Sequence, residues 1–100
     1  MVEIETSLKE KIIRFASFLE KQFSLVHVYL YGSYSTGTND QWSDVDLAVI
    51  LDEPESHSRE IFTLGKRFDQ DFEVFAFTKK DFDESRLPII PQIKKGIVIV

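Results

Sequence analysis

Two aspartates, Asp44 and Asp46, stand at the start of an apolar run that is typical of a buried strand. Side chains two residues apart on a strand point to the same face, about 6.5 Å apart at a ~3.3 Å rise per residue. Their oxygens can bind one octahedral cation or span the two cations of a transfer reaction. Aspartate is depleted from strands, so Asp46 favours a metal site. A turn that leads into the strand is the alternative for this pair alone.

A second feature, the pair Gly32 and Ser33, lies where the preceding apolar run ends, and ten residues separate Ser33 from Asp44. A glycine at a strand end lets backbone N–H groups approach a phosphate, and a helix that begins there adds its positive end. Alone, such a pair is usually only a turn. Beside two carboxylates, it predicts a site for nucleotidyl transfer, with the triphosphate at Gly32 and Ser33.

The composition limits the chemistry. The chain has no cysteine and two histidines, so a zinc site is not expected and any metal is held by oxygen, which favours magnesium or manganese. The net charge of −5 argues against stable direct binding to nucleic acid and suits a small nucleotide or a protein acceptor. No apolar run approaches ~18 residues, and the N-terminus is acidic, so we expect a cytoplasmic protein without membrane contact.

The 100 residues are expected to form one domain, 1–100. Apolar periodicity and turn residues predict alternating helices and strands. The expected order is helix 7–23, strand 25–31, short helix 33–36, strand 45–51, helix 58–68, strand 72–78 and helix 81–86. A last turn over 92–95 leads into 97–100, which is expected to form an edge strand or a partner contact. This α-β-α-β-α-β-α order predicts a small layered α/β (α+β) fold.

Local signals predict the ends of several elements. Ser7 and Glu10 have the spacing of a capping box, and Ser58 is expected to cap the helix that follows it. Pro88 and Pro91 are expected to interrupt the tail. Within the first helix, one apolar stripe is expected to face the core: Leu8, Ile12, Phe15, Ala16, Leu19 and Phe23.

The pattern Gly32-Ser33, ten residues, then Asp44-Val45-Asp46, with apolar strands on both flanks, resembles the signature of the DNA polymerase β-like nucleotidyltransferase superfamily. Its smallest branch, the minimal nucleotidyltransferases (MNT), is the nearest match, and the tail over 93–98 also resembles the end of these proteins. The resemblance implies a small mixed β-sheet flanked by helices. It also implies Mg2+ at three carboxylates and transfer of a nucleoside monophosphate from an NTP.

In this family Gly32 and Ser33 correspond to the triphosphate-binding positions, and Asp44 and Asp46 to metal ligands. The third carboxylate is expected on the next strand.

Glu73 lies between apolar neighbours and is the favoured third carboxylate, which is also the candidate base for the acceptor hydroxyl. Asp71 is expected on the same face and remains a competitor. If neither binds metal, Glu73 is an ordinary exposed acid. The chain departs from the family at Thr36, where an arginine is common; threonine offers no positive charge to phosphates.

The resemblance therefore suggests an Mg-dependent nucleotidyltransferase that moves AMP from ATP to a hydroxyl of a HEPN-type helical partner, as the antitoxin-like subunit of a toxin–antitoxin pair. The departure at Thr36 keeps an alternative open: an inactive binding module of the same fold that acts by contact through the apolar surface near 97–100. Transfer to a small molecule such as an aminoglycoside ranks third. The sequence leaves the oligomeric state open.

Overall fold

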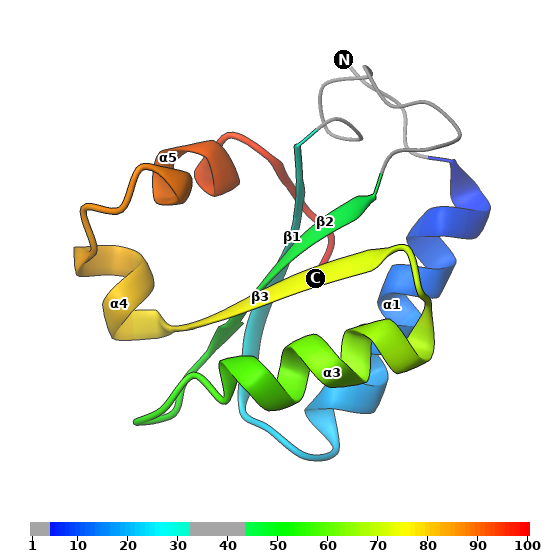
Figure 1. The fold of residues 1–100 in the computed structure, drawn as a ribbon, viewed down its shortest axis with the longest axis horizontal. Coiled ribbons are helices and arrows are strands. Elements are labelled where there is room, and N and C mark those ends of the chain that lie inside the picture. The colour runs from blue at the N-terminus through cyan, green and yellow to red at the C-terminus, as the bar shows by residue number, and fades with distance from the viewer. Residues whose placement is uncertain (1–4, 33–43) are drawn as a thin grey trace.

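A four-stranded mixed sheet lies at the centre of the molecule (Figure 1). The computed structural model describes residues 5–32 and 44–100. The strands are β1 (Leu25–Tyr31), β2 (Val45–Leu51), β3 (Phe72–Thr78) and β4 (Ile97–Val98), in the order β3-β2-β1-β4. β2 runs parallel to β3, and β1 runs antiparallel to both β2 and β4. The predicted small mixed sheet flanked by helices is confirmed.

Two pairs of helices cover opposite faces of this sheet. The helices are α1 (Thr6–Glu20), α3 (Ser58–Phe68), α4 (Lys79–Glu84) and α5 (Ile89–Lys94). α1 and α3 pack on one face, and α4 and α5 on the other (Figure 1). None of the helices within the described ranges is long and apolar enough to cross a membrane.

Alternation along the strands divides the core into two clusters, because successive side chains point to opposite faces. In β2, Val45, Leu47, Val49 and Leu51 pack with α1 and α3, whereas Ala48 and Ile50 pack with α4 and α5. Asp46 shares the face of Ala48 and Ile50 by the same alternation. The strand therefore supplies core residues on one face and an acid on the other.

The first helix is shorter than predicted, since it ends at Glu20. The predicted capping box at Ser7 and Glu10 is wrong, because the helix already begins at Thr6 and Glu5 occupies the N-cap without a side-chain hydrogen bond. The apolar stripe is confirmed: Ile12, Phe15, Ala16 and Leu19 are buried, while Leu8 and Phe23 pack partly buried against the same cluster.

Other predicted ends also differ. Ser58 is the first residue of α3 and not its cap; His57 takes that position with a φ of 51°. α4 begins at Lys79, two residues before Asp81, because the Thr78 hydroxyl accepts the Asp81 N–H at 3.0 Å and caps the helix. The short helix predicted over 33–36 lies outside the described residues.

The tail is more regular than its prolines suggested. Pro91 lies in the first turn of α5, where a missing N–H removes no helical hydrogen bond. The expected interruption at Pro91 is therefore wrong. The edge strand predicted within 97–100 is confirmed as β4, which pairs with β1.

Candidate active site

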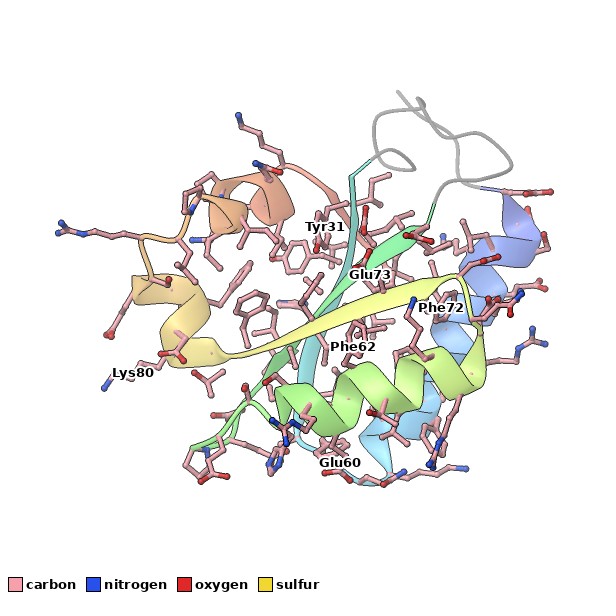
Figure 2. The ribbon with its side chains drawn as sticks, viewed as in Figure 1. Tyr31, Glu60, Phe62, Phe72, Glu73 and Lys80 are labelled. Carbon is pink, nitrogen blue, oxygen red and sulfur yellow. The ribbon has the colours of Figure 1, made fainter. Side chains whose placement is uncertain are left out.

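Three side chains from neighbouring strands form a row across the α4/α5 face of the sheet. The register places Tyr31 of β1 opposite Asp46 of β2, and Asp46 beside Glu73 of β3. All three lie at the end of the sheet where β2 and β3 begin and β1 ends; Figure 2 labels Tyr31 and Glu73 there. Residues from three strands thus converge at one point.

Asp46 and Glu73 are directly coupled. Burial of Asp46, the charges of Glu73 and Asp44, and a hydrogen bond with the Glu73 carboxyl raise the pKa of Asp46 to about 6. Like charges that must share a site favour the protonated form of one of them. A divalent cation between them would remove this repulsion, since carboxylate oxygens are its preferred ligands. The pair therefore fits a metal on chemical grounds.

Asp44 lies just before β2 and is exposed. Its charge acts on Asp46, but in the two ranges that the structure describes no group of three or more histidine, cysteine, aspartate or glutamate side chains is arranged to hold a metal ion. The geometry thus brings Asp46 and Glu73 together and leaves Asp44 at the rim. Buried Val45 anchors the segment, because its N–H donates to the Asp71 carbonyl at 2.7 Å.

The other candidate for the third carboxylate, Asp71, is exposed in the turn before β3. Its N–H donates to Asp69 Oδ1 at 2.8 Å, and it lines a cleft with Asp69 and Lys11. Its charge is not among the causes of the shifted pKa of Asp46, whereas that of Glu73 is. The geometry therefore favours Glu73 over Asp71.

Gly32 follows β1 directly and adopts a positive φ of 74°, which few residues other than glycine tolerate. A Cβ at this position would collide with the Asp46 Oδ2 atom. Glycine is therefore required both for the turn and for the space that Asp46 occupies. The second predicted phosphate-binding residue, Ser33, lies outside the described residues.

Tyr31 belongs to this site although its residue type and spacing did not predict it. The residue is 5% exposed, and burial together with the charges of Asp46 and Glu73 raises the pKa of its phenol. Its place at the end of β1, directly before Gly32, was the available signal. The cross-strand register that sets it beside Asp46 could not be seen in the sequence.

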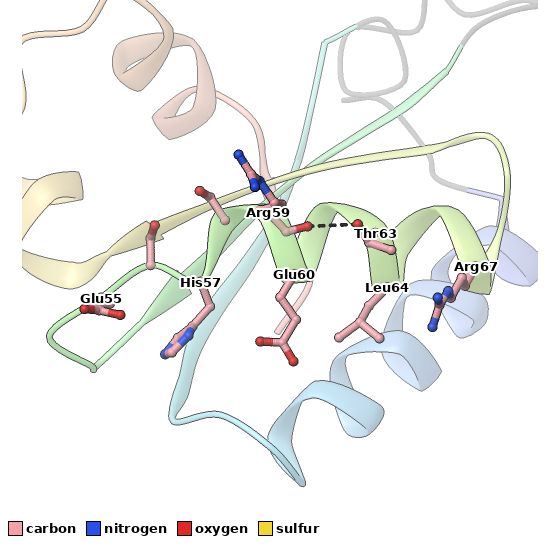
Figure 3. Close-up of a pocket in the computed structure, with 9 residues that line it drawn as sticks. Glu55, His57, Arg59, Glu60, Thr63, Leu64 and Arg67 are labelled. Carbon is pink, nitrogen blue, oxygen red and sulfur yellow. Dashed lines mark hydrogen bonds between the residues drawn. The ribbon is translucent and has the colours of Figure 1, made fainter.

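A cavity of about 660 Å3 lies elsewhere, along the outer surface of α3 (Figure 3). Its lining includes His57, Arg59, Glu60 and Arg67, and none of the predicted site residues. His57 Nε2 lies 3.0 Å from Glu53 Oε1, so a hydrogen bond within the loop holds part of this surface. The cavity is separate from the row of Tyr31, Asp46 and Glu73.

Comparisons with known proteins bear on the family and the fold of this chain. No curated protein matches the chain. One similar solved structure is described as "Crystal structure of the toxin-antitoxin with AMP-PNP"; it has a TM-score of 0.65 and 24% sequence identity, and the match covers 92% of this chain and 72% of that one. The family model described as "Nucleotidyltransferase domain" matches residues 9–97. The resemblance stated from the sequence is thus confirmed, and the chain belongs to the nucleotidyltransferase domain family.

Proposed function

We propose that this chain is a metal-dependent nucleotidyltransferase that moves AMP from ATP to a hydroxyl group of a HEPN-type helical partner, as the antitoxin-like subunit of a toxin–antitoxin pair. The main support is the coupled pair of Asp46 and Glu73 beside the Gly32 turn. Membership of the nucleotidyltransferase domain family supports the reaction class. The similar solved structure, a toxin–antitoxin complex with AMP-PNP, supports the nucleotide and the kind of partner.

In this reaction the acceptor oxygen attacks the α-phosphorus of ATP, a new P–O bond forms, and pyrophosphate leaves. Glu73 takes the proton of the acceptor hydroxyl, because its side chain is only partly buried on the α4/α5 face, beside Asp46, and can meet an incoming group there. Gly32 and Ser33 hold the phosphates. Asp44, Asp46 and Glu73 would hold Mg2+ or Mn2+, which neutralises charge on the phosphates.

A second candidate function is that of a binding module without useful turnover. Two observations favour it: Thr36 stands where the family often has arginine, and Val98 and Val100 expose 51% and 36% of their surface near the chain end. Such a module would act on its partner through this apolar surface. The two candidates differ in their need for the carboxylates.

The test uses ATP labelled at the α-phosphate, Mg2+ or Mn2+, and a small helical protein encoded by the neighbouring reading frame. We expect label to reach the partner, and we expect Asp46→Asn to abolish transfer. Asp83→Asn, an exposed acid of α4, is the matched control and should transfer normally. Absence of label with both metals would contradict the enzymatic proposal.

The same variants separate the two candidates. A double variant, Asp44→Asn with Asp46→Asn, should lose neutralisation of the partner if transfer is the function. If this variant still binds and neutralises the partner as the wild type does, the binding-module alternative is correct.

A further inference from the structure

β3 forms one edge of the sheet, and no described element pairs with its outer side. Figure 1 shows β3 in front of β1 and β2, with no described element crossing in front of it. Its seven residues, FEVFAFT, include no lysine and no proline, and their one charged residue, Glu73, lies beside Asp46. Natural edge strands are usually protected by lysine or other charged residues, by proline, by shortness or by a covering element. Beyond Glu73, the described part of the chain gives β3 none of these protections, so its edge is open to pairing with another strand.

The opposite edge of the sheet gives a direct comparison. β4 has two residues, so it offers few free backbone groups. β3 has seven residues and exposes 38% of Phe75 at its centre. The Phe75 ring lies 6.2 Å from the Phe62 ring of α3, which extends the apolar surface at this edge. Figure 2 labels Phe62 beside β3. Pairing with a further strand is thus expected at β3 and not at β4.

We infer that β3 pairs in antiparallel fashion with β3 of a second copy of this chain, with Phe75 on the twofold axis. This inference is independent of the proposed function. Opposite residues of an antiparallel pair point to the same face of the sheet. The two β3 strands can therefore be shifted against each other only in steps of two residues, because a shift by one residue would move every side chain to the other face. Of these, the register centred on Phe75 pairs all seven residues of each strand, with Phe72 opposite Thr78. Every other step loses pairs.

Charge supports the same register. It brings Asp71, just before the strand, to the same end of the ladder as Lys79 of the second copy, the first residue of α4; the twofold axis gives two such pairs of unlike charge. Both side chains are exposed in the single chain. The nearest allowed registers, centred on Val74 and on Ala76, pair only five residues of each strand, so they leave backbone groups at the strand ends unpaired.

The experiment measures the molar mass of the isolated chain by sedimentation equilibrium over a concentration series. We expect a dimer at micromolar concentration. Phe75→Lys places two cations on the axis and should weaken dimerisation by at least about tenfold, a change of ~1.4 kcal/mol. Val98→Lys, an exposed apolar residue on the other edge, is the matched control and should leave the dimer unchanged.

Charge reversal provides a second test that keeps the apolar strand intact. Asp71→Lys and Lys79→Asp should each weaken the dimer, and the two changes in one chain should restore it, because the pairs form again with opposite signs. Circular dichroism checks that each variant folds. A monomeric wild type would overturn the inference, as would a dimer that Phe75→Lys and both charge reversals leave unchanged. A monomer that uses Phe75 to hold an extended segment of another protein would also overturn it.

Discussion

The two faces of the sheet use the same strands for different purposes. On the α1/α3 face, the inward residues of β2 and β3 are apolar and belong to one buried cluster, except Thr78 at the end of β3. On the α4/α5 face, the cluster is smaller and ends at Asp46 and Glu73. Stability is therefore concentrated on the first face, and the second face can hold charged groups that a packed core would not accept.

The largest expected effect follows from the packing of the α1/α3 face. Phe72 is fully buried between Phe15 and Phe68, with ring centroids 5.7 and 5.9 Å away. Phe72→Ala removes these contacts and leaves a cavity, so the free energy of unfolding should fall by about 3–5 kcal/mol. Urea denaturation measures the change.

The control for this prediction is the next residue on the strand. Glu73→Gln points to the opposite face and removes one charge of a repelling pair, so it should change stability by less than about 1 kcal/mol. If the two substitutions cost the same, the contrast between the faces is wrong.

Much of this contrast could be predicted from the sequence, and the reason is local. β1, β2 and β3 begin and end where predicted, because turn-forming residues flank their apolar runs: Gly32 follows β1, Asp52 follows β2 and Asp71 precedes β3. Alternation then assigned Asp44 and Asp46 to one face. The sequence also indicated Glu73, because an acid between apolar strand residues needs an explanation.

The parts that could not be predicted depend on contacts between distant segments. The parallel register of β2 and β3 sets Glu73 beside Asp46, and the antiparallel register of β1 and β2 sets Tyr31 there. Neither register is visible in a single sequence. The helix caps failed for a different reason: several polar residues near each end compete for the same backbone groups, as Thr78 and Asp81 show.

The next effect is the contribution of Asp46, on the α4/α5 face, to stability, and it depends on pH. The pKa of Asp46 is raised to about 6, so the folded state favours the protonated carboxyl. This contribution to stability is fully present below the ordinary value of 3.8 and is lost as the pH rises through 6. Asp46→Asn should therefore stabilise the protein at pH 8, in EDTA, by about 1–2 kcal/mol after allowance for solvent screening.

The measurement is urea denaturation at pH 4 and pH 8. The stabilisation should be much smaller at pH 4, where the wild-type carboxyl is largely protonated. Asp83→Asn, on the surface of α4, should show no such dependence. Equal effects of Asp46→Asn at the two pH values would show that burial and the neighbouring carboxylates do not raise the pKa of Asp46.

The smallest effect is expected at the edge of the α1/α3 face, where Lys11 Nζ of α1 lies 2.7 Å from Asp69 Oδ2. Burial tends to raise the pKa of Asp69, but hydrogen bonds from Lys11 and the Asp71 N–H, with the Lys11 charge, outweigh it and lower the pKa. The stabilisation is therefore present above pH 3.8 and is lost as the pH falls through the lowered pKa. Because Lys11 is 41% exposed, Lys11→Met should cost only about 0.2–1 kcal/mol at pH 7, measured by urea denaturation. Lys9→Met, at an exposed position of the same helix, is the control and should leave the stability unchanged. If Lys11→Met still lowers the free energy of unfolding at pH 2, the apolar stem of Lys11, and not the ion pair, holds α1 against the turn before β3.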